Sequence, residues 1–206
     1  MKSKIPRPTV CRLCMVSRLL EKLHLQGRES ISSTELGKLS DISPYTVRKD
    51  FSFLGDLKVL NRCYDIVFLN NIIRRRLQLE GEKLVCVVGL GRIGSAILNY
   101  DSFLSHGYKI VLGFDSSINR VETIKTDISV YPAYEIEERV HFLSIDFAIL
   151  AVPASAAQEV AQRLINGGVK GILNFSQSII KTEVDGIVIQ NIDLVNELDF
   201  IRARLN

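Results

Sequence analysis

The chain has 206 residues, of which 47% are hydrophobic, and a formal net charge of +3 at pH 7. That length and composition are ample for packed cores in one or two domains. No apolar run reaches the roughly 18 residues of a membrane span, and the basic N-terminus lacks the apolar region of a signal peptide, so we expect a soluble, cytoplasmic protein that does not engage a membrane.

The charge is divided unevenly along the chain. Residues 1–80 carry 15 Lys and Arg against 8 Asp and Glu, whereas residues 81–206 carry 11 against 15. A basic first part indicates an anionic partner, and nucleic acid fits because phosphate contacts supply most non-specific affinity. Charge alone leaves an ordinary solvated surface open as the alternative.

The basic part begins with two predicted helices. Apolar residues recur at nearly helical spacing over 9–25, and Gly27 is expected to end this helix. Ser32 and Glu35 then have the spacing of a capping box, which predicts a short helix over 33–40.

A third helix is predicted over 44–54, with Ser43 as its N-cap and Pro44 at its first position. Two short helices joined by a tight turn, the second with a basic outer face, indicate a helix-turn-helix. A small helical bundle with a merely solvated basic face is the alternative. The residues that we expect to contact DNA from this segment are Ser43, Tyr45, Thr46, Arg48, Lys49 and Ser52.

A strand-turn-strand wing is predicted around Asn61, and its cations Lys58 and Arg62 are further candidates for contact with DNA. Another helix is predicted over 66–79, with three arginines near its end that favour the helix dipole. The linker to the acidic part is expected at 79–83.

The acidic part opens with a dinucleotide-binding pattern. An apolar run at 84–88 precedes Gly89, Gly91 and Gly94, and Asp115 follows the third glycine by 21 residues. The glycines allow a tight turn, a close approach of the backbone to a pyrophosphate, and close packing of a helix on a strand. A related domain that has lost its ligand is the alternative.

A second apolar run, over 109–114, ends in Asp115, and an acid at this place favours NAD over NADP. Asp115 is placed to bind both hydroxyls of an adenine ribose and to repel a 2′-phosphate, and Ser116 and Ser117 supply no cation to receive one. The glycine turn adds to the predicted cofactor site the residues Gly89, Leu90, Gly91, Arg92, Ile93 and Gly94.

From residue 83 onward, strand-like and helix-like segments alternate, which predicts an α/β fold with a parallel sheet. The strands are expected at 84–88, 109–114, 146–151, 170–174 and 186–190, and the helices at 92–99, 134–142 and 155–166. Ligands bind at the carboxyl ends of such strands, so the cleft is expected to include Ala151, Val152 and Pro153.

A last amphipathic helix is predicted over 193–205. Little of the domain remains for its apolar stripe to pack on, so we expect it to join a partner subunit.

Other reactive residues do not suggest catalysis or a metal site. Cys11 and Cys14 form a C-x-x-C without a second pair of ligands, so no metal is predicted. The three histidines, His24, His106 and His141, lie outside the predicted cleft loops. A small NAD-dependent dehydrogenase is therefore the weaker alternative, and we expect no enzymatic activity.

The chain resembles the Rex family of bacterial redox-sensing transcriptional repressors over nearly its whole length. The segments that carry the resemblance are IPRPTVCRL, ISSTELG, TVRKDFSFLG, VVGLGRIGSAILNY, LAVPASAAQEVAQRL, GGVKGILNF and NIDLVNEL. The resemblance implies a winged helix-turn-helix DNA-binding domain over 1–80. It also implies an NAD-binding and dimerisation domain of the Rossmann type over 81–206, whose terminal helix is swapped between subunits.

The family binds palindromic operators in double-stranded DNA as a homodimer and senses the ratio of NADH to NAD⁺. By resemblance, NADH releases the DNA and NAD⁺ leaves the dimer competent to bind it. The resemblance also implies roles for particular residues. Arg48 and Lys49 match the basic pair of the recognition helix. The residues that match the switch between the two states are Arg18, Arg92, Tyr100 and Asp193. The resemblance also places Tyr100 in the cofactor site, near the nicotinamide.

The wing departs from the family pattern, which is roughly FGxxGxRGxGY. The aligned stretch FLGDLKVLNRCY has Lys58, Asn61 and Cys63 where glycines are usual, and Leu60 falls near the basic tip. Lost glycines change which backbone conformations a turn can reach. A regulator that binds NADH and acts on a protein partner, with reduced or lost DNA binding, is therefore a further alternative.

Overall fold

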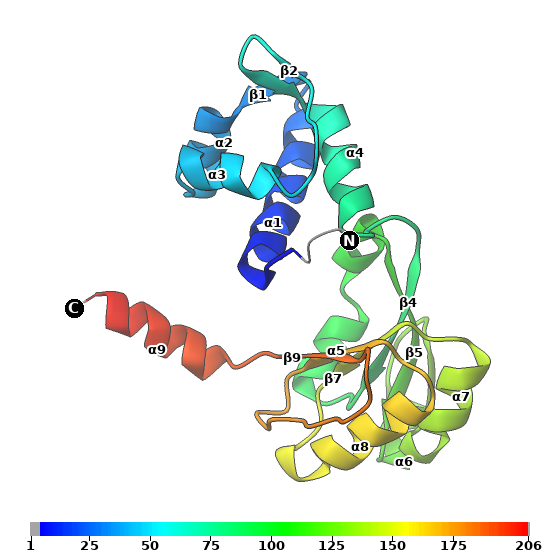
Figure 1. Ribbon diagram of the computed structural model, residues 1–206. Helices are drawn as coiled ribbons and strands as arrows, with labels where there is room; N and C mark the ends of the chain where they lie inside the picture. The colour runs from blue at the N-terminus through cyan, green and yellow to red at the C-terminus, as the bar shows by residue number, and fades with distance from the viewer. Residues whose placement is uncertain (1–4, 206) are drawn as a thin grey trace. The chain divides into compact units, whose positions relative to one another are not determined.

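The computed structural model describes residues 5–205 and divides the chain into two units, one ending at Glu80 and the other beginning at Gly81 (Figure 1). This boundary falls inside the predicted linker. Each unit has a hydrophobic core of its own. No helix within the described range combines the length and apolar character needed to cross a bilayer.

The first unit contains four helices in its described part and a small antiparallel sheet of strand order β1-β3-β2. In chain order its elements are α1 (Arg7–Leu25), β1 (Ser30–Ser32), α2 (Ser33–Ser40), α3 (Pro44–Phe51), β2 (Val59–Leu60), β3 (Cys63–Asp65) and α4 (Ile66–Arg76). The winged helix-turn-helix expected from the sequence is confirmed.

Local hydrogen bonds explain where the two short helices begin. The Ser32 hydroxyl accepts the backbone N–H of Glu35 at 3.1 Å, and the Ser43 hydroxyl accepts that of Thr46 at 3.1 Å. The Glu35 carboxylate does not complete the capping box. It pairs instead with Arg28, at 3.0 Å between Nη2 and Oε2, and this hydrogen-bonded ion pair lowers the pKa of Glu35.

Two helices end earlier than predicted. Helix α3 ends at Phe51 and not near residue 54, because a turn follows it at once. Helix α4 ends at Arg76, three residues before the predicted end at 79.

The arginines at the end of α4 bind within the first unit. Arg74 donates to Glu21 at 2.9 Å and to the carbonyl of Leu79, and Arg76 donates to the carbonyl of Phe53. At least two of the three arginines therefore stabilise the fold locally.

The wing is closed by a two-residue turn. Leu60 pairs with Cys63, and the turn residues Asn61 and Arg62 have φ values of 51° and 64°. Positive φ at both positions is typical of a type I′ hairpin turn, for which Asn is favourable and Arg is uncommon. The hairpin forms without the glycines usual in the family.

The second unit is a doubly wound α/β domain with a six-stranded parallel sheet of order β6-β5-β4-β7-β8-β9. Its strands are β4 (Lys83–Val88), β5 (Tyr108–Asp115), β6 (Ser129–Pro132), β7 (Phe147–Leu150), β8 (Gly171–Asn174) and β9 (Val188–Asn191). Its α-helices are α5 (Arg92–Leu98), α6 (Ile118–Thr123), α7 (Ile136–Phe142), α8 (Ala154–Asn166) and α9 (Leu194–Arg204), and 3₁₀ turns cover Asp101–His106 and Ala133–Glu135. Strand β6 and helix α6 were not predicted.

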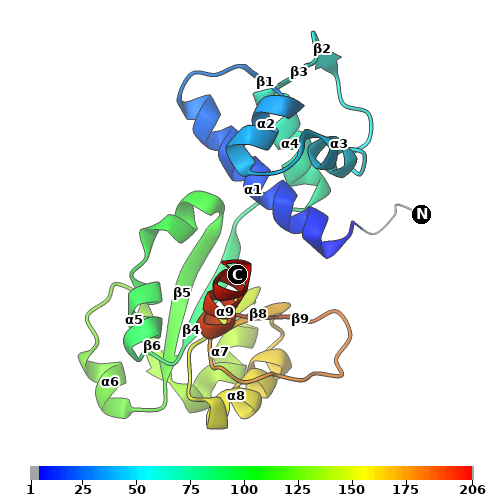
Figure 2. The ribbon, with the colours of Figure 1, turned by 90° about the vertical axis from the view of Figure 1, so that its left-hand side faces the viewer.

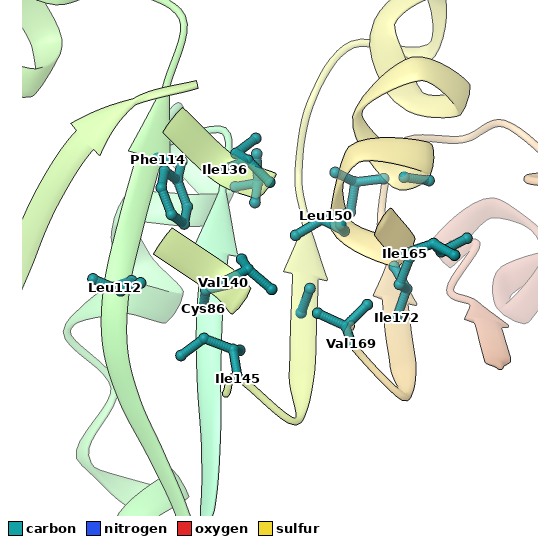
Figure 3. Packing of buried hydrophobic residues seen from close by; sticks show 14 of the residues in the cluster. Cys86, Leu112, Phe114, Ile136, Val140, Ile145, Leu150, Ile165, Val169 and Ile172 are labelled. Atoms are coloured by element: carbon teal, nitrogen blue, oxygen red, sulfur yellow. The ribbon is translucent and has the colours of Figure 1, made fainter. Parts of the chain in front are cut away.

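Alternate residues of β4 point into two cores on opposite faces of the sheet, as expected for a buried parallel strand. Cys86 and Val88 pack with α7 and α8, whereas Val85 and Val87 pack on the side of α5. Helix α5 lies on one side of the sheet, and α7 and α8 lie on the other (Figure 2). The core under α7 and α8 is continuous from Phe114 across the sheet (Figure 3). Burial raises the pKa of the Cys86 thiol to about 12, so Cys86 is a packing residue and a poor nucleophile.

Candidate dinucleotide site and DNA-facing surface

The turn between β4 and α5 requires glycine at its first and last glycine positions. Gly89 has a φ of +87°, and a Cβ there would lie 2.6 Å from the carbonyl oxygen of Ala151. A Cβ on Gly94 would lie 1.9 Å from the carbonyl oxygen of Gly89. A Cβ on Gly91, by contrast, would meet no atom within 4 Å. The turn thus packs tightly on β7 and on itself, and stays open above Gly91.

A cavity of about 550 Å³ opens at the carboxyl ends of β4, β5 and β7. Its volume is in the range of ligand pockets. It is lined by Val88, Gly89, Gly91, Ile93, Asp115, Ser116, Arg120, Ala133, Ala151, Val152, Pro153, Ala154, Ala156, Val160, Phe175, Ser176 and Gln177.

Seven of the residues predicted to bind the cofactor line this cavity, namely Gly89, Gly91, Ile93, Asp115, Ala151, Val152 and Pro153. The other four do not. The Leu90 side chain is buried in the core beside α5, and Gly94 is buried in α5. Arg92 is exposed at the start of α5. Tyr100 lies at a second, neighbouring pocket.

The Asp115 side chain is 4% exposed and is held by three donors. Its Oδ2 accepts Leu90 N at 2.7 Å and Arg120 Nη1 at 3.2 Å, and its Oδ1 accepts Ser117 N at 2.8 Å. Leu90 therefore serves the site through its backbone.

The sequence prediction at Asp115 considered the two serines that follow it, and these supply no cation. The structure adds a cation from farther along the chain, because α6 brings Arg120 back to the carboxylate. A basic residue five positions after the acid was the signal in the sequence.

The second pocket, of about 290 Å³, has an almost wholly apolar wall. Its lining residues are Ala96, Ile97, Tyr100, Phe103, Ile149, Leu173 and Phe175. Phe175 lines both pockets, so the two adjoin. Tyr100 packs edge-on against Phe103 with 5.6 Å between the ring centroids.

In the first unit, the predicted DNA-contacting residues of α3 lie outside the core. Tyr45, Arg48, Lys49 and Ser52 are exposed along the helix, with Ser43 at its start. Thr46 is half-buried, and its hydroxyl lies 2.8 Å from that of Ser43.

Arg48 donates to the Ser33 hydroxyl at 3.3 Å, in an exposed position. On the wing, Arg62 is exposed, and the exposed Lys58 ammonium lies 5.9 Å from the centre of the Phe68 ring.

Sequence reasoning missed Asp50, the buried anchor of α3. Asp50 is 3% exposed, and its carboxylate accepts the Thr9 hydroxyl at 2.9 Å and Arg12 Nε and Nη2 at 2.6 and 2.8 Å. The hydrogen bond to Asp50 raises the pKa of Arg12. This cluster fixes α3 against α1, so it sets the orientation of the exposed face of α3.

The predicted switch residues Arg18 and Asp193 and the C-x-x-C cysteines lie outside both pockets. Arg18 is exposed on α1, and Asp193 caps α9 by accepting the backbone N–H of Val195 at 2.9 Å. Cys11 and Cys14 are free thiols, and the described residues contain no group of three or more metal-ligating side chains.

Helix α9, red in Figure 1, has no buried residue. Its exposed apolar side chains, together with the residue after it, are Leu194, Val195, Leu198, Phe200, Ile201 and Leu205. An exposed apolar surface of this kind indicates an interaction site.

Two family models match the chain. A model described as putative DNA-binding protein N-terminus matches residues 4–52, and one described as CoA binding domain matches residues 80–178.

The chain is also similar to curated and solved relatives over nearly its full length. It is 38% identical over 195 residues to the redox-sensing transcriptional repressor Rex of Geobacillus kaustophilus, covering 95% of this chain and 91% of the relative. It is 37% identical to redox-sensing transcriptional repressor Rex 1 of Enterococcus faecalis, covering 94% and 89%.

Among solved structures, the Rex-family repressor RSP in complex with β-NAD⁺ and operator DNA is 28% identical with a TM-score of 0.91, covering 100% of this chain and 94% of that one. RSP in complex with β-NADH is 28% identical with a TM-score of 0.87, covering 100% and 96%.

Proposed function

This chain belongs to the Rex family of redox-sensing transcriptional repressors, and we propose that it binds a palindromic operator in double-stranded DNA as a homodimer that NADH releases. The observation that carries the proposal is the presence, in one chain, of a helix-turn-helix with an exposed basic face and a doubly wound domain with an open glycine turn.

The cleft fits a dinucleotide. The empty space above Gly91 admits a pyrophosphate close to the backbone, and the buried Asp115 carboxylate supplies an acceptor for ribose hydroxyls. The adjoining apolar pocket beside Tyr100 and Phe175 suits an uncharged reduced nicotinamide ring better than a cationic oxidised one, because burying a charge without a partner is costly. That difference in affinity is what a redox switch requires.

Repression fits this cleft better than dehydrogenation does. Among the described residues, the ionisable side chains that line the larger cavity are Asp115 and Arg120, which are paired with each other. The adjoining apolar pocket adds Tyr100, with no second ionisable side chain beside it in the described lining to relay a proton. General acid–base catalysis needs a group within reach of the reacting atom. His24, His106 and His141 do not line it. We therefore propose that NADH acts as a signal and is not consumed.

The test is to select duplexes from a randomised library with the full-length protein and then titrate a labelled selected duplex by fluorescence anisotropy. We expect specific binding that NADH reverses at concentrations where NAD⁺ does not. Absence of any selected sequence, with NADH binding shown by calorimetry, would contradict the DNA role and favour a protein partner. Steady consumption of NADH with alcohols or hydroxy acids would contradict the purely regulatory role.

Arg48→Ala is expected to cost about 1–3 kcal/mol of binding to the selected operator, if Arg48 reads a base edge. Arg48 is exposed on α3, and its guanidinium makes one long, exposed hydrogen bond to Ser33 that it can exchange for a contact with DNA at little cost. The measurement is anisotropy with the operator and with a scrambled duplex. Lys22→Ala, an exposed cation on α1, is the control. Equal operator affinities of the Arg48 variant and the wild type would remove Arg48 from base readout.

Deleting residues 193–206 is expected to weaken dimerisation. Because α9 buries none of its residues in the second unit, the remainder should keep its fold, and the apolar surface of α9 is then available for a partner subunit. Sedimentation velocity across a concentration series measures the effect, with circular dichroism as the check on folding. A truncated chain that sediments as a stable dimer would exclude this role for α9.

A further inference from the structure

The charged end of the cleft, formed by Asp115 and Arg120, holds an ion pair and not a lone carboxylate. Three donors already engage the Asp115 oxygens, two of them on Oδ2. A carboxylate offers roughly four lone-pair positions. A ribose that is to bind both oxygens must therefore compete with Arg120 for Oδ2.

We propose that Arg120 is a specificity-determining residue of the cleft. Its guanidinium can bind a 2′-phosphate, but its ion pair with Asp115 competes with that binding. The pair then sets the preference between NAD(H) and NADP(H). This inference rests on the dinucleotide-binding function proposed above and adds the means by which that site distinguishes two cofactor classes.

The local fold explains why Arg120 reaches the acid. Ser117 donates its backbone N–H to Asp115 Oδ1, and its hydroxyl accepts the backbone N–H of Arg120 at 3.4 Å, so the turn after β5 leads directly into α6. Arg120 lies on the first turn of that helix, and its side chain returns to Asp115. Both residues line the same cavity.

The exposure of Arg120 makes it available to a ligand. Its side chain is 48% exposed, whereas that of Asp115 is 4% exposed. Within residues 5–205, Asp115 is the ion-pair partner found for Arg120. A guanidinium is planar and binds phosphate oxygens in pairs, so one that swings off Asp115 is suited to a ribose 2′-phosphate.

Two opposing effects then act on a 2′-phosphate. The Asp115 carboxylate repels it, and Arg120 attracts it. In the wild type the carboxylate keeps Arg120 engaged, so NADH is preferred. Neutralising Asp115 has two effects, because it removes the repulsion of the 2′-phosphate and also frees the Arg120 guanidinium to bind it. Removing Arg120 has one effect, since only the repulsion by Asp115 then remains.

The experiment measures NADH and NADPH affinities of the full-length protein by calorimetry for the wild type, Arg120→Met, Asp115→Asn and the double variant. We expect Arg120→Met to raise the ratio of NADH to NADPH affinity about tenfold, and Asp115→Asn to tighten NADPH by about 10- to 100-fold, the range of one charge-assisted contact. The double variant should lose that gain. Lys125→Met, an exposed cation outside the cavity, is the control for charge alone.

Equal NADPH affinities of Asp115→Asn and the double variant, with NADH bound by the wild type, would overturn the role of Arg120 and leave the proposed function standing. A change of the affinity ratio in Lys125→Met equal to that in Arg120→Met would overturn it as well. A wild type that binds neither NADH nor NADPH would overturn both this inference and the proposed cofactor.

Discussion

Asp50→Ala is expected to destabilise the first unit by about 3 kcal/mol, because it breaks a largely buried ion pair and leaves polar groups without their acceptor. Two residues of α1 donate three hydrogen bonds to this carboxylate. The Thr9 hydroxyl loses its buried partner, and the Arg12 side chain is only 30% exposed, so water compensates it in part. The estimate therefore stands at the low end of the cost of breaking buried pairs.

The lower stability of the first unit should appear as faster hydrogen exchange of the α1 and α3 amides. These amides report on the first unit separately from the second. Asp50→Asn, which keeps an oxygen for Thr9, should lie between the wild type and the alanine variant. Asp56→Ala, in the exposed turn after α3, is the matched control. Exchange in Asp50→Ala as slow as in Asp56→Ala would show that the cluster contributes little to stability.

The position of Asp50 also links stability to DNA binding. It lies on the same helix as Arg48 and Lys49, but its side chain binds α1. Without Asp50, α3 is held less firmly against α1, and the outer face that we propose to read DNA loses its fixed orientation. Operator affinity should fall in Asp50→Ala even though Asp50 is buried. The salt dependence should stay near that of the wild type, because no phosphate-binding cation is removed.

The features that the sequence predicted correctly depend on near neighbours in the chain. The starts of α2 and α3 follow from Ser32, Ser43 and Pro44, whose side chains act within three residues of their own position. The glycine turn is likewise a local pattern, and so is the parallel sheet that its flanking apolar runs predict.

The features that were missed depend on packing or on weak local signals. Asp50 looks like any acid on a polar helix face until Thr9, 41 positions earlier, is placed against it. The edge strand β6 has only four residues, none fully buried, and lacks the apolar run that marks central strands. Helix α6 has six residues and no buried face, so no periodicity reveals it.

Gly94→Ala is expected to abolish NADH binding and to destabilise the second unit by about 3 kcal/mol or more, at the upper end of overpacking costs. The added Cβ would overlap the carbonyl oxygen of Gly89, a backbone atom that cannot swing aside as a side chain does. Helix α5 must then move away from the turn, and with it the backbone N–H groups at its start. Both the fold and the cleft depend on that contact.

Gly91→Ala separates binding from folding. Its φ of −69° is open to alanine, and the new Cβ meets no protein atom within 4 Å, so the thermal stability should stay within about 1 kcal/mol of the wild type. The methyl group instead fills the space that we assign to the pyrophosphate, which should weaken NADH about 10- to 100-fold. Calorimetry with NADH and scanning calorimetry of the same samples measure both quantities. Unchanged NADH affinity in Gly91→Ala, beside a destabilised Gly94→Ala, would mean that the turn serves packing and that the dinucleotide lies elsewhere.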